Sequence, residues 1–225
     1  LVLTGGDPLK RPDLFELIAH ARGLGFTVAV TPSGTQGLTE EVIQRLREAG
    51  VWMLALSLDG SGPQTHDVLR GVPGSYAQTT QAFRWAAAVE IPVQVNTLVC
   101  SETLGDLPNV FDRLSDLGVA QWALFFLIRV GRGEVLGEVT PEQGEEVMHW
   151  VYETAKDAPF RIRTTEAPHY RRVLLQREAG HRRRDGLASV VRDARPGFGV
   201  RDGNGVMFIS HTGEVYPSGF LPLAA

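Results

Sequence analysis

The sequence predicts an α/β protein built around a largely parallel sheet. Strand-like and helix-like segments alternate along the 225 residues, in five or six consecutive βα units. Residues 51–58 (VWMLALSL) are almost continuously apolar, which is typical of a strand buried on both faces of a parallel sheet. Small and polar residues follow the expected strands, at the ends where ligands bind in doubly wound sheets and in (β/α) barrels. The alternation by itself leaves both architectures open.

The expected elements follow from apolar periodicity and from the residues at their ends. Strands are predicted at residues 1–4, 27–31, 51–58, 92–99, 120–128 and 160–164, and a β-hairpin at residues 206–210 and 214–216. Helices are predicted at residues 12–24, 40–49, 75–89, 107–117, 141–155 and 168–176. Thr39 and Thr140 are expected to cap two of these helices, because a hydroxyl can accept a hydrogen bond from a backbone N–H of the first turn.

Three parts of the chain are predicted. Residues 1–176 form the sheet and its helices, residues 177–204 form a linker rich in Gly, Arg and Asp, and residues 205–225 begin a further domain. The chain opens on LVLTGGDP, inside an expected strand, and it ends on PSGFLPLAA without a closing element. We therefore expect it to be cut at both ends.

The composition predicts a globular protein. The chain is 43% hydrophobic and 21% charged, and it has no apolar run of the about 18 residues that a membrane helix needs. The only cysteine, Cys100, cannot form an internal disulfide or hold a cluster by itself, which fits a reducing, cytoplasmic location. Residues 161–195 contain ten Arg against four acidic residues, in a chain of net charge −4. This basic segment could meet an anionic substrate or could be a solvated surface.

The first candidate ligand-binding residues follow the first and third strands. Gly5 and Gly6 let the backbone approach a ligand closely, and Asp7 could join their carbonyl groups in holding an ammonium group. Ser57 and Asp59 are two positions apart on one expected strand, so their side chains share a face and could bind a ribose or an amino acid. Each pattern also has a structural explanation, as a turn or a helix cap.

Two more polar residues lie in the segment HDVLRG, and Arg70 is expected in a loop above the carboxyl ends of the strands. Arg70 could bind a carboxylate through two parallel hydrogen bonds, or it could form a surface ion pair. His66 is more simply a turn residue than a catalytic base. The sequence contains no HExxH, GxSxG, Walker or GxGxxG motif, so the enzyme classes that those motifs define receive no support.

Together these segments resemble the radical S-adenosylmethionine (SAM) superfamily. TGGDPL is similar to that family's GGE motif, with Asp in place of Glu. SLDGSGPQTHDVLRGVPGSY resembles a segment of the branch with a C-terminal SPASM or twitch extension, which includes haem and cofactor biosynthesis enzymes and peptide maturases. GVMFISHTGEVYPSGFLP resembles the start of such an extension. The resemblance covers nearly the whole chain, and it implies a partial (β/α)6 barrel of the TIM type whose first βα unit is missing.

The resemblance implies SAM and a [4Fe–4S] cluster as cofactors. By similarity, the methionine ammonium of SAM would contact Gly5, Gly6 and Asp7, with Ser33 nearby, and the methionyl carboxylate would pair with Arg70. The ribose or methionyl group would contact Ser57 and Asp59. Asn96 would lie beside the ribose or adenine, and Phe126 and Leu127 near the adenine. The family holds its cluster with the three cysteines of CxxxCxxC, upstream of GGE. This chain lacks that motif, so we expect the cluster ligands to precede Leu1 and the chain alone to be inactive.

The implied activity is that of a radical SAM oxidoreductase or maturase, which cleaves SAM reductively to a 5′-deoxyadenosyl radical that abstracts hydrogen from the substrate. The substrate could be a cofactor precursor, a haem or porphyrin, or a peptide. Four residues could touch it or could simply start a helix, namely Glu166, His169, Tyr170 and Arg171. The expected protein partner is a reductant such as ferredoxin or flavodoxin, with neither a membrane nor a nucleic acid. Two alternatives stay open: a cluster-free barrel that binds SAM or a nucleotide, and a non-catalytic domain that binds a partner through its Arg-rich segment.

Overall fold

The computed structural model describes residues 1–129, 131–165, 167, 169–185, 201–202 and 205–219. One parallel sheet contains β1 (Val2–Leu3), β2 (Ala29–Val30), β3 (Met53–Ser57), β4 (Val93–Val99), β5 (Gln121–Phe126) and β6 (Arg161–Thr165). These strands lie side by side in the order in which they occur along the chain. A doubly wound sheet reverses its strand order at a switch point, whereas a barrel keeps it, so the sequential order confirms the barrel-type fold.

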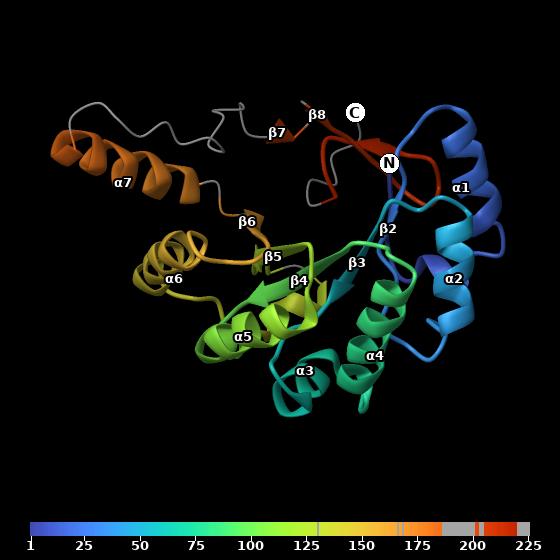
Figure 1. The fold of residues 1–225 in the computed structure, drawn as a ribbon, viewed down its shortest axis with the longest axis horizontal. Coiled ribbons are helices and arrows are strands. Elements are labelled where there is room, and N and C mark those ends of the chain that lie inside the picture. Colours follow the sequence, from blue (N-terminus) through green and yellow to red (C-terminus); the bar gives the residue numbers. More distant parts are fainter. Residues whose placement is uncertain (130, 166, 168, 186–200, 203–204, 220–225) are drawn as a thin grey trace. The chain divides into compact units, whose positions relative to one another are not determined.

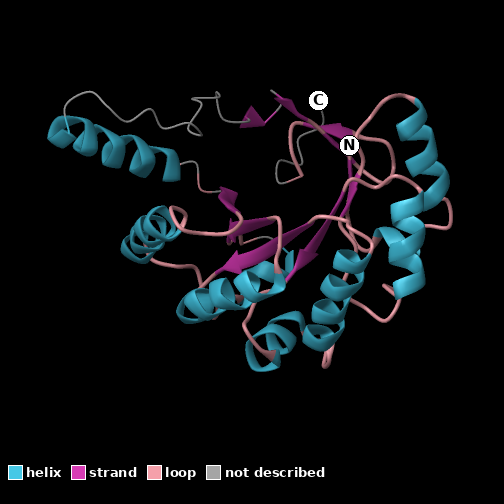
Figure 2. Ribbon diagram, viewed as in Figure 1, coloured by secondary structure: helices cyan, strands magenta, loops and turns pink. Residues whose placement is uncertain are grey.

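Helices cover one face of the curved sheet (Figure 1, Figure 2). They are α1 (Leu14–Gly23), α2 (Glu40–Glu48), α3 (Pro63–Arg70), α4 (Ser75–Ala88), α5 (Leu107–Leu117) and α6 (Pro141–Thr154), and α7 (Tyr170–Asp185) follows β6. Leu56, Val95 and Trp122 are register partners on β3, β4 and β5, and all three are fully buried in the main core. Since alternate residues of a strand point to opposite faces, every second residue of these strands packs under the helices.

Apart from the end of α7 (Tyr170–Asp185), the ends of the predicted helices agree with the structure to within a few residues. The Thr39 hydroxyl accepts a hydrogen bond of 3.3 Å from the Val42 N–H at the start of α2. Thr140 and Gln143 form a reciprocal capping box at the start of α6. Gly118 follows α5 with a φ of 65°, a left-handed conformation that glycine adopts without strain.

Two predictions about helices are wrong. Arg70 was expected in a loop and His66 in a turn, but residues 63–70 form α3, which begins at Pro63 and is followed by Gly71 with a φ of 66°. The only fully buried side chain of α3 is His66, so this helix lacks the apolar stripe that reveals a helix in sequence. Helix α7 continues to Asp185, so residues 177–185, expected in the linker, are helical.

Internal contacts divide the chain into residues 1–174 and residues 175–225. In the second unit, β9 (Phe208–Ile209) pairs antiparallel with β10 (Val215–Tyr216), which confirms the predicted hairpin, and β7 (Arg201–Asp202) pairs with β8 (Gly205–Val206). The three-part domain division stays a prediction. Among the described helices, none is both long enough and apolar enough to cross a bilayer.

Candidate functional site

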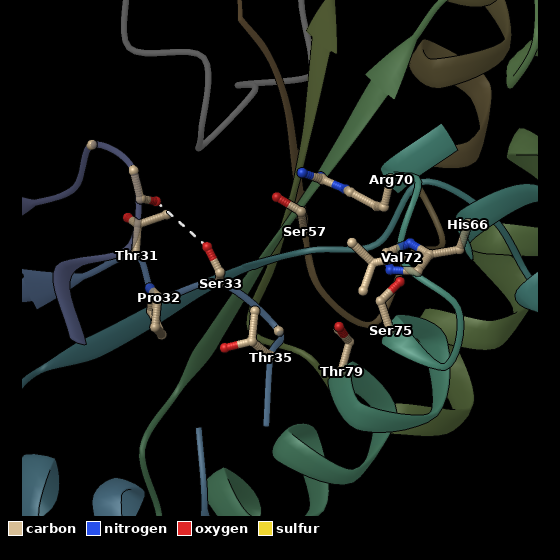
Figure 3. Close-up of a pocket in the computed structure, with 13 residues that line it drawn as sticks. Thr31, Pro32, Ser33, Thr35, Ser57, His66, Arg70, Val72, Ser75 and Thr79 are labelled. Atoms are coloured by element: carbon tan, nitrogen blue, oxygen red, sulfur yellow. Dashed lines mark hydrogen bonds between the residues drawn. The ribbon is translucent and has the colours of Figure 1, made fainter. Parts of the chain in front are cut away.

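A cavity of about 300 Å³ opens at the carboxyl ends of β1, β2 and β3, where the sequence predicted a ligand site (Figure 3). Its walls come from the three loops after these strands and from the segment of α3 and α4. The lining residues are Gly5, Gly6, Thr31, Pro32, Ser33, Gly34, Thr35, Ser57, His66, Arg70, Val72, Ser75 and Thr79. Five of the predicted cofactor-binding residues are therefore brought together here: Gly5, Gly6, Ser33, Ser57 and Arg70.

The loop after β1 forms one wall of the cavity. Gly5 has a φ of 123°, a backbone conformation that L side chains rarely adopt. Asp7 does not line the cavity; its Oδ1 accepts hydrogen bonds from the backbone N–H of Leu9 at 3.2 Å and of Ser33 at 3.4 Å. The Ser33 hydroxyl donates to the Gly6 carbonyl at 3.4 Å (Figure 3). Asp7 thus ties the first two rim loops together, although the resemblance placed it at the ligand.

We predict that Gly5→Ala destabilises this wall. An alanine held at a φ of 123° has a strained backbone even where its Cβ has free space around it. Such strain costs about 1–3 kcal/mol. Denaturant unfolding of the intact protein should show a loss of that size. The matched control is Gly23→Ala in α1, where no atom lies within 4 Å of the new Cβ and where alanine is the better helix former. An unchanged stability for Gly5→Ala would show that the loop relaxes without cost.

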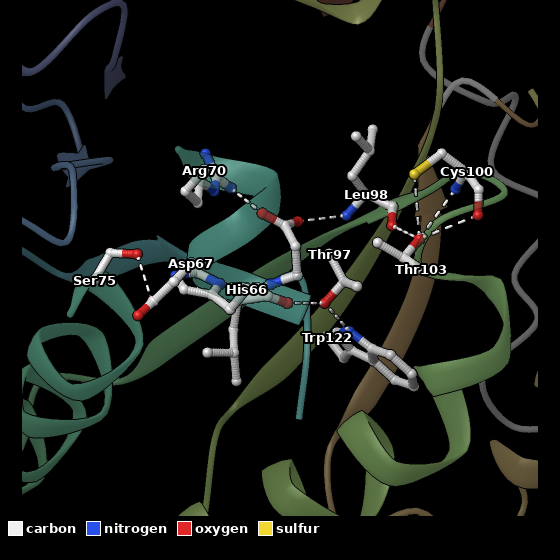
Figure 4. A network of polar contacts seen from close by, with 11 residues as sticks. His66, Asp67, Arg70, Ser75, Thr97, Leu98, Cys100, Thr103 and Trp122 are labelled. Carbon is white, nitrogen blue, oxygen red and sulfur yellow. Dashed lines mark hydrogen bonds and ion pairs between the residues drawn. The ribbon is translucent and has the colours of Figure 1, made fainter. Parts of the chain in front are cut away.

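The opposite wall is built on an ion pair between the buried Asp59 and the half-buried Arg70 (Figure 4). Asp59 is only 1% exposed, and its Oδ1 accepts a hydrogen bond of 2.8 Å from the Leu98 backbone N–H. Its Oδ2 lies 2.6 Å from Nη2 of Arg70, an ion-pair contact that lacks the alignment of a hydrogen bond. Asp59 is absent from the cavity lining. Asp59 therefore positions Arg70, whereas the resemblance placed it at the ribose or methionyl group.

Polar contacts fix the elements that carry this pair. The Thr97 hydroxyl donates to the Leu58 carbonyl at 2.6 Å and accepts from the Trp122 indole at 2.8 Å, which joins the end of β3 to β4 and β5. Asp67 on α3 accepts hydrogen bonds from the backbone N–H of Gly74 and Tyr76, each at 2.7 Å. Arg70 is thus the last residue of an anchored helix, and not a residue of a loop.

His66 lies on α3 and is 1% exposed. Its Nδ1 accepts a hydrogen bond of 3.0 Å from the Asp59 backbone N–H, so the neutral ring carries its proton on Nε2. Burial lowers the pKa of His66, while the Asp59 charge acts to raise it and the Arg70 charge acts to lower it further. The preferred interpretation of His66 as a turn residue is wrong. With Nδ1 occupied and Nε2 protonated, the neutral ring offers the cavity a donor rather than a base.

The depressed pKa of His66 predicts a dependence of stability on pH. Because the folded state binds the proton less tightly than the unfolded chain, this contribution to stability is complete above about pH 6.5 and is lost as the pH falls toward the lower folded pKa. His66→Asn keeps an acceptor for the Asp59 N–H and cannot titrate. The unfolding free energy of the variant should therefore fall less than that of the wild type between about pH 7 and about pH 5.5. His20→Asn, at an exposed position of α1, should leave the wild-type pH dependence intact.

The remaining predicted cofactor residues lie outside the cavity lining. Asn96 on β4 accepts a hydrogen bond of 2.7 Å on Oδ1 from the Gln94 amide. Phe126, at the end of β5, is half-buried and packs edge-on against His169 with 6.4 Å between ring centroids. Leu127 donates its backbone N–H to the Val99 carbonyl at 3.1 Å. That these three residues contact the adenine or the ribose of SAM stays a prediction.

The predicted substrate residues lie around the start of α7. His169 and Arg171 are exposed, and Tyr170 is half-buried with its pKa raised to about 12 by burial and by the nearby Tyr152. Glu166 lies outside the described residues. The structure thus leaves His169 and Arg171 accessible, and the role of all four residues stays a prediction.

The cavity and the sequential parallel sheet define a (β/α)-barrel protein with its ligand site at the carboxyl ends of the strands. The family model of the Radical SAM superfamily matches residues 1–114, just over half of the chain, and these include every residue that lines the cavity. The chain belongs to the radical SAM superfamily. Members of this superfamily bind SAM and a [4Fe–4S] cluster, as the resemblance implied.

Curated relatives match over nearly the whole chain, and by name they are enzymes. The AdoMet-dependent heme synthase of Methanosarcina barkeri is 35% identical over 230 residues, which cover 100% of this chain and 64% of the relative. The AdoMet-dependent heme synthase of Oleidesulfovibrio alaskensis is 37% identical over 229 residues, 99% of this chain and 58% of the relative. The chain therefore spans about three fifths of the length of these relatives.

A solved structure confirms the fold. The crystal structure of Streptococcus suis SuiB bound to S-adenosylmethionine superposes with a TM-score of 0.71, over 100% of this chain and 51% of SuiB. At 13% identity this likeness shows the fold alone. It agrees with the predicted partial barrel of the TIM type.

The cavity offers groups that suit SAM, whereas this chain does not carry the ligands of the cluster. Arg70 has a buried Nε without a hydrogen-bond partner, so a charged donor beside the cavity is unused. No atom lies within 4 Å of a Cβ built on Gly5 or Gly6, so their backbone is open to a ligand. The single cysteine, Cys100, is buried, and the described residues contain no group of three His, Cys, Asp or Glu that could hold a metal.

Proposed function

We propose that this chain forms the SAM-binding part of a radical SAM enzyme of haem synthesis. The observation that carries the proposal is the cavity at the ends of β1 to β3, which brings together open glycine backbone, six hydroxyl side chains and one anchored guanidinium. A SAM methionyl group needs these partners, since it has an ammonium, a carboxylate and a neighbouring ribose. The names of the two relatives support the haem branch.

Four of the lining residues have a proposed task. The Gly5 and Gly6 carbonyl groups accept hydrogen bonds from the ammonium, because backbone oxygens there are not shielded by a side chain. Arg70 binds the methionyl carboxylate by a charge-assisted hydrogen bond, and Ser57 binds the ribose or the methionyl group. Asp59 and Asp7 act through the residues that they hold, which are Arg70 and the Ser33 loop. Together with a reduced cluster, bound SAM supplies a radical that abstracts hydrogen from the substrate.

The proposed substrate is a porphyrin that carries carboxylate groups, and the proposed electron donor is a ferredoxin or flavodoxin. The relatives' names and the ten Arg of residues 161–195 support an anionic substrate of this kind. A peptide is the other substrate that the resemblance implied. Membership of the superfamily disfavours the cluster-free barrel and the non-catalytic domain.

The test uses the intact protein, prepared without oxygen and with its cluster reconstituted. SAM binding is measured by calorimetry, and reductive cleavage is followed as methionine and 5′-deoxyadenosine with and without a porphyrin. The proposal predicts SAM binding and a turnover that depends on the porphyrin and that forms haem when the porphyrin already holds iron. Turnover with a peptide but no porphyrin would overturn the haem assignment alone, and an absence of SAM binding would overturn the whole proposal.

A further inference from the structure

The inner face of the sheet, opposite the helices, carries several polar side chains along strands β3 to β6, beside the apolar Leu98 and Phe125. Ser57, Asn96, Ala123 and Arg163 form one row of register partners across these four strands. Ala55, Gln94, Gln121 and Arg161 form a second row. Residues between these positions, such as Trp122 and Ile162, pack into the core under the helices. Because side chains alternate along a strand, the two rows point to the other face, where Ser57 lines the cavity.

A closed barrel ordinarily fills this face with bulky branched apolar side chains. Here the Gln121 amide donates to Gln94 Oε1, and the Gln94 amide donates to Asn96 Oδ1 at 2.7 Å. This chain of amides leaves the Asn96 Nδ2 hydrogens as its terminal donors. Side-chain amides on the inner face cost free energy unless they meet polar partners. Gln121 and Gln94 already donate within this chain, so the Asn96 Nδ2 hydrogens are the donors that it offers to a polar ligand.

Two arginines stand at the β6 end of the two rows. Arg161 and Arg163 are exposed, and within the described part of the chain neither guanidinium has a hydrogen-bond or ion-pair partner. The strand residues of β3 to β6 include no Asp or Glu. Ala123, between Asn96 and Arg163, adds only a methyl group to the row and is itself fully buried. The row thus offers donors and positive charge, which select an anionic ligand rich in acceptors.

We propose that Arg163, assisted by Arg161, binds a carboxylate group of the substrate on the inner face of the sheet. The proposal rests on the proposed function and adds the residues that recognise the substrate. Arg163 lies three strand spacings from Ser57, about 14 Å along the sheet, so a substrate held there reaches toward the SAM cavity. Arg70 serves the carboxylate of SAM, and Arg163 serves a carboxylate of the substrate.

The test measures how the intact protein, loaded with SAM, binds a tetracarboxylate porphyrin and the methyl ester of the same porphyrin. Arg163→Ala should weaken binding of the carboxylate form by about tenfold or more and should change binding of the ester little. Arg163→Lys should recover part of the lost affinity for the carboxylate form, because lysine keeps the positive charge but not the planar guanidinium. Arg47→Ala, which removes an exposed arginine from α2 on the helix side, is the matched control and should change neither. The SAM dissociation constant should be unaltered in all variants.

Other outcomes separate this inference from the proposed function. If Arg163→Ala binds the porphyrin carboxylate as tightly as the wild type, the inference is wrong. A Glu-rich peptide, with its Gln-substituted counterpart, forms the second arm. If only this peptide binds and Arg163→Ala weakens its binding, the inference stands and the haem substrate is wrong. If neither ligand binds while SAM does, the inference is wrong and the SAM site stands.

Discussion

Replacing Arg70 by alanine should weaken SAM binding by about 1.5–3 kcal/mol, the range for a hydrogen bond to a charged group. This corresponds to an increase of about 10- to 150-fold in the dissociation constant. The Arg70 side chain is 37% exposed at the cavity, so it can reach a ligand while Asp59 and α3 hold it in place. Calorimetry of the intact protein, well below its unfolding temperature, measures the effect directly.

Two further variants show whether Arg70 acts as proposed. Arg70→Lys keeps the charge but loses the planar guanidinium, which can donate two parallel hydrogen bonds to a carboxylate. Its affinity for SAM should therefore lie between those of the wild type and Arg70→Ala. Arg84→Ala removes an exposed arginine from α4, outside the cavity, and should leave SAM binding unchanged. An unchanged dissociation constant for Arg70→Ala would show that Arg70 serves only the ion pair with Asp59.

Replacing Asp59 by alanine should lower the unfolding free energy by on the order of 3 kcal/mol. The substitution leaves the Leu98 N–H without its acceptor, takes the counter-charge from Arg70 and opens a void at a position that is 1% exposed. SAM affinity should fall as well, because the Arg70 guanidinium is no longer fixed. Denaturant unfolding and calorimetry on the same preparation measure both effects.

Asp59→Asn separates charge from shape. Asparagine can still accept the Leu98 hydrogen bond through its carbonyl oxygen, so this variant should be more stable than Asp59→Ala and yet bind SAM more weakly than the wild type. Asp13→Ala is the control, because the Arg11–Asp13 ion pair is exposed at both side chains and should contribute little to stability. Equal stabilities of the Asp59→Ala and Asp13→Ala variants would show that burial of the Asp59–Arg70 pair does not matter.

The sequence was most informative where neighbouring residues decide the structure. The apolar run 51–58 predicted β3, Thr39 and Thr140 predicted helix starts, and the spacing of βα units predicted a parallel sheet. Strand and cap preferences depend on local backbone geometry and burial, which a short window of sequence records. The motif around Gly5 and Gly6 and the segment from Ser57 onward also led to the correct superfamily.

The sequence was least informative where side chains pair across long separations. Local pattern put Arg70 in a loop and Asp59 at a ligand, whereas the structure puts Arg70 at the end of α3 and turns Asp59 toward it. Helix α3 buries a histidine instead of an apolar stripe, so periodicity did not reveal it. The sequence did not indicate Arg163 as a candidate, because an arginine in a strand is expected to face solvent. Its place beside Ala123 becomes known only from the register between β5 and β6.

The sequence by itself determined the βα alternation, the caps, the glycines of the rim and the family. Only the tertiary structure decided the sequential strand order, the Asp59–Arg70 pair and the row from Ser57 to Arg163. The physical reason is that register between parallel strands is set by packing of residues tens of positions apart, and a slip of one residue would turn each side chain to the opposite face.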